Sequence, residues 1–128
     1  MELLRGGRPR AVITGVGTVT ALGDAHTMWT NLKEGVSGIR KLETINVDHV
    51  PVKIGGEVRD FNPRDYINDH KEARRMGRAS QFAYATAKMA VEDAGLTIES
   101  IQGERTGVVI GTSLGSHEMS EQSTLKYK

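Results

Sequence analysis

The sequence predicts an α/β fold in which helices flank a parallel or mixed sheet. Two short apolar runs, 11–15 and 106–111, have the continuous hydrophobicity of strands that are buried on both faces. The segment 70–94 between them carries apolar residues three and four positions apart, which is the period of an amphipathic helix. Buried strands that are joined through helices are typical of an α/β layer.

The first strand leads into a turn and a helix. Gly15 and Gly17 end the strand 11–15, because glycine adopts turn conformations without steric cost. Asp24 is a typical N-cap for the helix that follows, and Gly35 is the predicted stop.

The middle of the chain is less regular. Residues 36–51 show no period and are predicted to form a connection that contains at most short structure. The segment 52–58 is predicted to be a short or edge strand with a bulge at Gly55 and Gly56. Residues 61–63, Phe-Asn-Pro, have the composition of a turn.

The long helix 70–94 has clear boundaries. Asp69, with Glu72 three residues later, resembles a capping box, and Gly95 is the predicted stop. Gly77 weakens the helix and is expected to divide it. One face carries small and apolar side chains that permit close approach of a neighbour: Ala79, Phe82, Ala83, Ala87, Ala90, Val91 and Ala94.

The C-terminal part contains the second strand, a loop of small residues and a polar end. The loop 112–116 follows the strand, and Leu114 is its one apolar side chain. The small residues beside Leu114 favour tight packing of this loop. The alternative is that they leave room for a ligand. Residues 120–128 are polar and show no stop signal.

Composition excludes several classes of function. The chain has 128 residues, and 17 basic residues stand against 16 acidic ones, so its overall charge favours neither nucleic acid nor a membrane surface. No apolar run approaches the roughly 18 residues of a membrane span. The absence of cysteine excludes disulfides, thiolate metal sites and a cysteine nucleophile within these residues. We therefore expect a cytoplasmic protein with no nucleic-acid or membrane partner and a flexible start at residues 1–9.

Two patterns that resemble functional motifs favour structural interpretations. Gly15 and Gly17 resemble part of a dinucleotide fingerprint, but Thr20 occupies the third glycine position and Glu34 falls within a helix pattern. The histidines are scattered and lack the spacing of a metal site: His26, His49, His70 and His117. We predict a structural turn and surface histidines, with no metal site.

Basic residues gather near the start of the long helix. If the helix continues through Gly77, four of them fall within roughly one 100° sector: Lys71, Arg74, Arg75 and Arg78. Such a face is suited to docking an acidic partner. The alternative, which the pattern alone favours, is a solvated face on which Glu72 pairs with Arg75.

Taken together, these segments resemble the N-terminal part of a β-ketoacyl-acyl carrier protein synthase, and they are most similar to the type II elongating enzyme of the thiolase superfamily. The resemblance keeps the family's order and spacing over about residues 10–125. Its blocks, which begin with RAVITGVGTVTALG, lie at 10–23, 29–39, 53–63, 71–76, 92–96 and 107–111. Several independent blocks make this signal far more specific than a single glycine pattern.

The resemblance implies a thiolase-type fold with two related halves in a homodimer, in which residues 1–128 form the N-terminal portion of the first half. It implies a cysteine nucleophile, two histidines and a lysine, all beyond Lys128, so that no catalytic residue lies in this chain. The implied reaction is the decarboxylative condensation of malonyl-acyl carrier protein with an enzyme-bound acyl thioester in fatty-acid elongation. No cofactor would bind directly, because the carrier protein brings its own phosphopantetheine arm.

The resemblance also implies peripheral roles for four residues. Lys71, Arg74 and Arg75 match basic positions that contact acidic helix residues of acyl carrier protein. Leu114 matches the apolar gate beside the acyl pocket, where isoleucine is usual. The sequence departs from the family at four positions. The family usually has aspartate where this chain has Gly77, glycine where it has Ser113 and Ser116, and proline where it has Ala21. We expect a weaker helix cap at Gly77.

Two alternatives to a condensing enzyme stay open. The first is a non-catalytic paralogue, similar to a chain-length factor, that pairs with a true synthase as a partner subunit. The second is a stand-alone module that binds carrier protein through its basic face, which is disfavoured because half a sheet exposes apolar edges. For these residues alone we expect low stability and no condensing activity.

Overall fold

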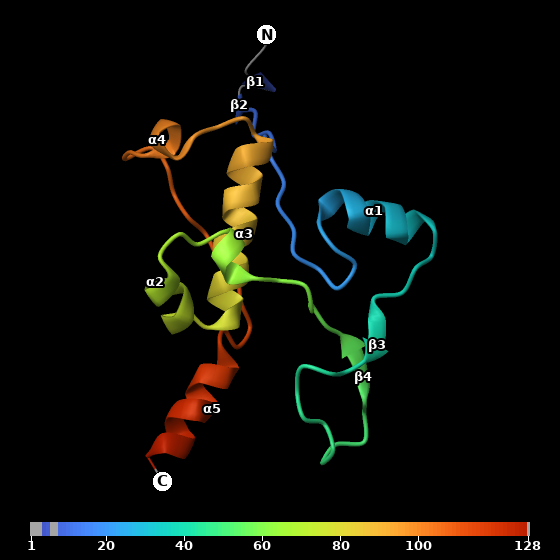
Figure 1. The fold of residues 1–128 in the computed structure, drawn as a ribbon. Coiled ribbons are helices and arrows are strands. Elements are labelled where there is room, and N and C mark those ends of the chain that lie inside the picture. Colours follow the sequence, from blue (N-terminus) through green and yellow to red (C-terminus); the bar gives the residue numbers. More distant parts are fainter. Residues whose placement is uncertain (1–3, 6–7, 128) are drawn as a thin grey trace.

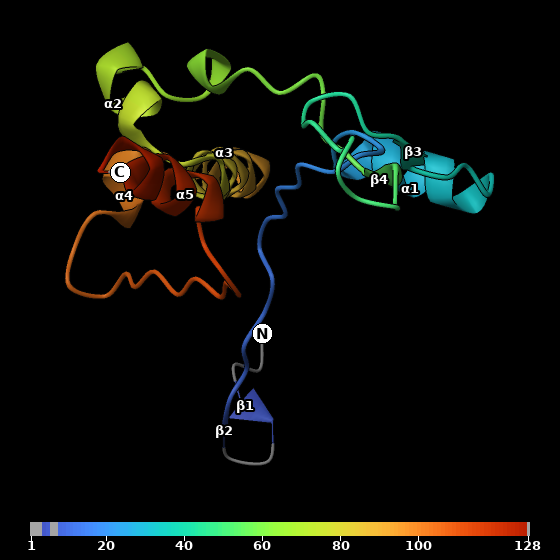
Figure 2. The same ribbon diagram turned by 90° about the horizontal axis from the view of Figure 1, so that it is seen from below.

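The computed structural model describes residues 4–5 and 8–127, and a long central helix organises the chain (Figure 1). The described elements are β1 (Leu4–Arg5), β2 (Arg8–Pro9), α1 (Ala25–Lys33), β3 (Ile39–Lys41), β4 (Ile54–Gly56), the 3-10 turn η1 (Pro63–Asp65), α2 (His70–Arg75), α3 (Arg78–Asp93), α4 (Ile98–Ile101) and α5 (His117–Lys126). Two lobes result. Figure 2 shows α2, α3, α4 and α5 grouped on one side and α1, β3 and β4 on the other, with extended segments between them.

The best-packed part of the chain is the corner where η1, α2 and α3 meet. η1 contacts both helices. Phe61 stacks on Tyr66 with ring centroids 5.5 Å apart, and it meets Phe82 of α3 edge-on at 4.8 Å. The buried apolar residues of the described chain all come from this corner: Ile67, Ala73 and Ala85. η1 therefore connects α2 with α3.

The helix predicted after Asp24 is confirmed as α1, with both of its boundaries. The Asp24 carboxylate accepts a hydrogen bond from the backbone N–H of Thr27 at 2.8 Å, and this bond lowers the pKa of Asp24. Gly35 follows the helix with a φ of +71°, a conformation that favours glycine. α1 buries none of its residues, and Trp29 is 61% exposed.

The strand predicted at 52–58 is confirmed at its centre as β4. β4 pairs antiparallel with β3, which is a short element inside the predicted connection 36–51. The predicted bulge at Gly55 and Gly56 is wrong, because both glycines keep regular one-to-one pairing with β3. Leu42 occupies the space that a side chain at Gly55 would need, because an added Cβ would lie 3.0 Å from Leu42 Cδ2.

The helix predicted at 70–94 is divided at Gly77, as its sequence indicates. Met76 and Gly77 are extended, with ψ angles of 134° and 157°, so α2 ends at Arg75 and α3 begins at Arg78. Gly95 ends α3 with a φ of +67°. The helical sector that joins Arg78 to the other basic residues therefore does not exist.

The two predicted buried strands are wrong as strands. Neither 11–15 nor 106–111 pairs with any described segment, and their side chains face solvent, with Ile13 87% and Val109 99% exposed. A strand needs hydrogen-bonding neighbours on its edges. No described segment supplies them, so these runs keep an irregular path (Figure 1). The α/β class is confirmed, with two-stranded antiparallel sheets among the described residues.

Gly15 and Gly17 pack directly on the backbone of α3. A Cβ at Gly15 would lie 2.0 Å from the Ala90 carbonyl oxygen, and one at Gly17 would lie 2.1 Å from that of Thr86. The backbone N–H of Val16 also donates to Asp93 Oδ2 at 2.9 Å. The predicted close approach to the alanine face of this helix is confirmed, and the glycines have the structural role that their pattern favours.

Two helices were missed by the sequence pattern. α4 is a single turn that Thr97 and Ser100 close with reciprocal hydrogen bonds. α5 overlaps the segment 120–128 that was interpreted as a polar end, and it has no strong apolar stripe that would indicate a helix. At the other end, β1 and β2 pair as a short hairpin, and residues 1–3 and 6–7 of the predicted flexible start lie outside the described part. No described helix is long and apolar enough to cross a membrane.

Candidate functional site

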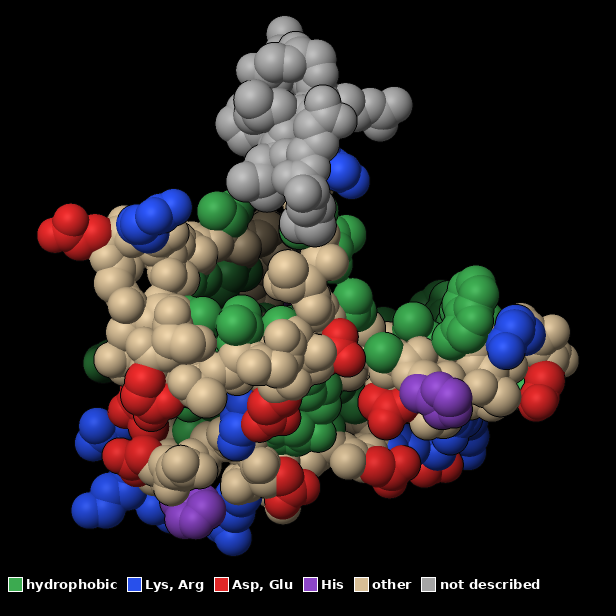
Figure 3. Space-filling view, turned by 90° about the horizontal axis from the view of Figure 1, so that it is seen from above, with side chains coloured by type: hydrophobic (Ala, Val, Ile, Leu, Met, Phe, Trp, Pro, Cys, Tyr) green, Lys and Arg blue, Asp and Glu red, His purple; other side chains and the backbone are tan. Residues whose placement is uncertain are grey.

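The basic face of α2 is the clearest candidate for a binding surface. Lys71, Arg74 and Arg75 lie at i, i+3 and i+4, so they share one side of the helix, and all three are exposed. None of their side chains makes a hydrogen bond or ion pair with another described residue, and the pair expected between Glu72 and Arg75 is not formed. Basic side chains gather at the lower left of Figure 3, in the corner where α2 lies.

Local sequence determines where α2 begins and which charges lie at its two ends. The Asp69 carboxylate accepts hydrogen bonds from the backbone N–H groups of Lys71 at 2.8 Å and Glu72 at 3.1 Å. These bonds lower the pKa of Asp69, with the bond from Glu72 as the larger cause, and they satisfy two N–H groups at the helix start. Arg74 and Arg75 lie in the last turn, where the helix dipole favours positive charge.

Arg78 does not belong to this basic face. Its guanidinium lies over the rings of Phe82 and Phe61, with 4.8 Å and 5.7 Å to the ring centroids, and it donates to the Val58 carbonyl oxygen at 2.6 Å. These contacts connect α3 to the segment that follows β4. Arg78 therefore stabilises the fold, and three cations form the face rather than four.

Leu114 lies on an exposed loop beside an apolar hollow. Its side chain is 75% exposed, and the loop is turned by Gly115, whose φ is +59°. The hollow has a volume of about 660 Å³ and lies between α3 and the segment 108–115. Thr112 and Gly115 line it, whereas the side chain of Leu114 does not.

The basic helix and the Leu114 loop meet at the junction between α2 and α3. Gly77 is buried, and a Cβ there would lie 1.9 Å from the Ser116 Oγ. Next to it, the backbone N–H of Arg78 donates to Glu118 Oε1 at 2.8 Å. Gly77 has no side chain to cap α3, so Glu118 of α5 supplies the acceptor. Sequence reasoning missed this contact, because nothing local links residues 40 positions apart.

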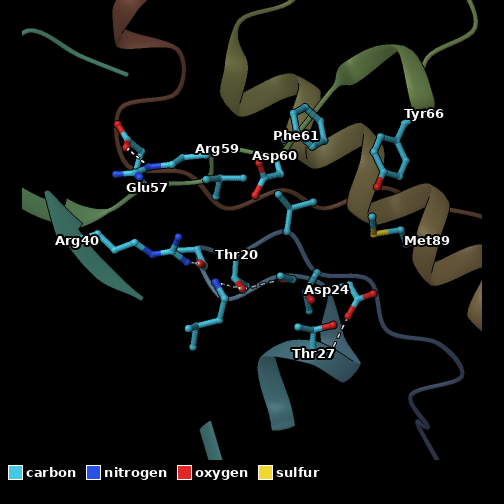
Figure 4. Close-up of a pocket in the computed structure, with 16 residues that line it drawn as sticks. Thr20, Asp24, Thr27, Arg40, Glu57, Arg59, Asp60, Phe61, Tyr66 and Met89 are labelled. Atoms are coloured by element: carbon cyan, nitrogen blue, oxygen red, sulfur yellow. Dashed lines mark hydrogen bonds and ion pairs between the residues drawn. The ribbon is translucent and has the colours of Figure 1, made fainter. Parts of the chain in front are cut away.

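A second hollow of about 320 Å³ lies between the lobes, and Arg40, Glu57 and Arg59 in its lining are engaged in holding the fold (Figure 4). Glu57 accepts hydrogen bonds from the hydroxyl and backbone N–H of Thr44 and pairs with Arg59 at 2.8 Å. The bond from the Thr44 hydroxyl is the largest cause that lowers the pKa of Glu57, to about 2. Arg40 donates to the Ala21 carbonyl oxygen at 3.0 Å. We interpret this cluster as structural.

Comparisons with known proteins agree on one family. Residues 9–128 match the family model described as "Beta-ketoacyl synthase, N-terminal domain". The chain is 43% identical over 113 residues to "3-oxoacyl-[acyl-carrier-protein] synthase 2" of Staphylococcus aureus (strain COL), and 35% identical over 115 residues to the protein of that name from Synechocystis sp.. These alignments cover 88% and 89% of this chain and 27% of each relative.

A solved structure shows the same fold. "The ishigamide ketosynthase/chain length factor" superposes with a TM-score of 0.78 at 31% identity, over 91% of this chain and 30% of that one. The described residues therefore adopt the N-terminal part of a thiolase-type α/β fold, which defines the class of the condensing enzymes. The chain belongs to the β-ketoacyl synthase family. It spans about a quarter of the length of the curated relatives that it matches.

Proposed function

We propose that this chain is the part of a 3-oxoacyl-acyl carrier protein synthase that receives acyl carrier protein during fatty-acid elongation. The whole enzyme condenses malonyl-acyl carrier protein with an acyl group held as a cysteine thioester. Loss of CO₂ from the malonyl group leaves a carbanion, which attacks the thioester carbonyl and releases the cysteine thiolate. The sequence has no cysteine. The nucleophile of this reaction therefore comes from outside these 128 residues, and phosphopantetheine arrives on the carrier protein.

The observation that carries this proposal is the basic face of α2. Its three cations have no ion-pair partner among the described residues, and the helix that presents them contacts η1 and buries Ala73. A fixed and unpaired set of cations attracts an acidic partner and fixes its register. The curated relatives are named for a reaction on acyl carrier protein, which supports that protein as the partner.

The charge reversal Arg74→Glu in the full-length protein tests the docking role. We expect the KM for malonyl-acyl carrier protein to rise about fivefold or more, because one attractive contact becomes repulsive. The matched control is Arg105→Glu, which makes the same charge change at an exposed arginine away from α2. Malonyl-CoA, which has no acidic carrier, serves as the second substrate and should show an unchanged KM. An unchanged KM for the carrier substrate in Arg74→Glu contradicts the proposal.

We also propose that Leu114 gates the acyl pocket and that the full-length protein is a homodimer. Support for the gate comes from the position of the loop, which borders the apolar hollow along α3. Leucine and isoleucine have the same volume, so the substitution keeps an apolar gate of similar size. Leu114→Ala is expected to change the acyl-chain length profile while the KM for carrier protein stays the same.

A second candidate is a non-catalytic paralogue that pairs with a true synthase. It is favoured by one observation, the structural similarity to a protein named as a ketosynthase/chain length factor. The two functions differ at the nucleophile position of the full-length protein. A cysteine there supports the synthase, and glutamine or another residue supports the paralogue.

A further inference from the structure

α2 is too short to hold its own position. It has six residues, and isolated helices of that length are unstable in water. The orientation of the basic face therefore depends on how the two ends of α2 are fixed to the rest of the chain. Asp69 fixes the start from within the local sequence.

The C-terminal end of α2 leaves carbonyl groups without helical partners. In a continuing helix the Ala73 carbonyl oxygen would accept from the backbone N–H of residue 77. The chain instead becomes extended at Met76, and the last helical bond there runs from the Met76 N–H to the Glu72 carbonyl oxygen at 3.1 Å. The carbonyl oxygens of Ala73 and Met76 therefore need donors from elsewhere.

One side chain of α3 supplies both donors. The amide nitrogen of Gln81 donates to the Ala73 carbonyl oxygen at 2.7 Å and to the Met76 carbonyl oxygen at 3.2 Å. Gln81 is half-buried, and its own backbone N–H bonds the Gly77 carbonyl oxygen in the first turn of α3. Both acceptors are carbonyl oxygens, so this place requires a donor group and rejects an acceptor.

We propose that Gln81 is a positioning residue for carrier-protein binding: it closes the C-terminal end of α2 from α3 and so holds the basic face of Lys71, Arg74 and Arg75 in its binding orientation. This proposal rests on the proposed docking function of that face. Gln81 touches no substrate in this role. Its effect is preorganisation, which removes the ordering cost that a loose helix would add to binding.

Two variants of the full-length protein remove the donor in different ways. Gln81→Glu places a carboxylate against two carbonyl oxygens at a helix C-terminus, where negative charge is disfavoured. Gln81→Leu is neutral and of similar size. We expect each to raise the KM for malonyl-acyl carrier protein about threefold to tenfold, as loss of a net hydrogen bond or two predicts. The kcat and the kinetics with malonyl-CoA should stay the same.

A rescue variant and a matched control sharpen the test. Gln81→Lys restores a donor of sufficient length and should keep the original KM. Gln102→Glu makes the same change at the exposed C-cap of α4 and should have no effect.

The outcomes separate the two proposals. If Arg74→Glu raises the KM and neither donor-less variant does, the positioning role of Gln81 is wrong and the docking function stands. If Arg74→Glu leaves the KM unchanged, the docking function itself is wrong. If both donor-less variants lose malonyl-CoA activity as much as carrier activity, Gln81 is a general structural residue and the proposal fails.

Discussion

The corner formed by η1, α2 and α3 differs sharply from the two apolar segments 11–15 and 106–111. The corner buries Ile67, Ala73 and Ala85, whereas Val109 in the second segment is 99% exposed. The α3 part of the corner and the two segments all have clear apolar patterns in the sequence. The difference shows that a helix can complete its own backbone hydrogen bonds and needs only one packing neighbour, whereas a strand also needs other strands on its edges.

The largest expected effect concerns the 128-residue chain in isolation. We expect no condensing activity and low stability, because the exposed apolar segments contribute little burial. Hydrogen exchange should be fast at 11–14 and 106–111 and slowest in the middle of α3, near Ala85. Condensing turnover by these residues alone would contradict the expected lack of activity. Equal protection from exchange in both regions would contradict the difference in packing between them.

A smaller effect is expected from adding one methyl group at Gly17, which packs on the backbone of α3, and at Gly107, in the unpaired segment 106–111. Gly17→Ala forces a Cβ to within 2.1 Å of the Thr86 carbonyl oxygen, a backbone atom that cannot move aside. We expect the free energy of unfolding of the isolated chain to fall by about 1–3 kcal/mol, which is typical of overpacking. Gly107→Ala is the matched control, since its Cβ would meet no atom within 4 Å, and its effect should stay within about 0.5 kcal/mol. Urea unfolding measures both; equal destabilisation would show that 106–111 is packed.

The smallest effect is a local change in acid, in the lobe that contains β3 and β4. Hydrogen bonds from Thr44 lower the pKa of Glu57 from 4.5 to about 2, so the folded state favours the charged carboxylate. The resulting stability is present above pH 4.5 and is lost as the pH falls toward 2. The chemical shift of the Thr44 amide should titrate near pH 2, and Glu57→Gln should abolish that titration. A midpoint near pH 4.5 would show that these hydrogen bonds do not persist in solution.

Local chemistry in the sequence predicted the helix boundaries. Asp24, Asp69 and the glycines at 35 and 95 mark helix ends in the structure as they do in the pattern, because caps and left-handed turns act within a few residues. Division at Gly77 was predictable for the same reason. The continuous sector that includes Arg78 was not borne out, since it depended on the helix passing through that glycine.

The basic face shows what the sequence pattern could not predict. Sequence spacing places Lys71, Arg74 and Arg75 on one side of a helix, but it could not show that Gln81 closes the end of that helix. Glu118 is a similar case. It caps α3 in place of the side chain that Gly77 lacks, from a helix without a strong apolar stripe.

The sequence by itself determined the family, the α/β class, the main helices with their caps, and the cationic residues of α2. These properties depend on motifs and on interactions between residues close in the chain. Only the tertiary structure decided which apolar runs are paired, where Arg78 binds, and which side chains join α2, α3 and α5. Strand pairing and contacts between helices depend on partners far away in the chain, and no local pattern specifies those partners.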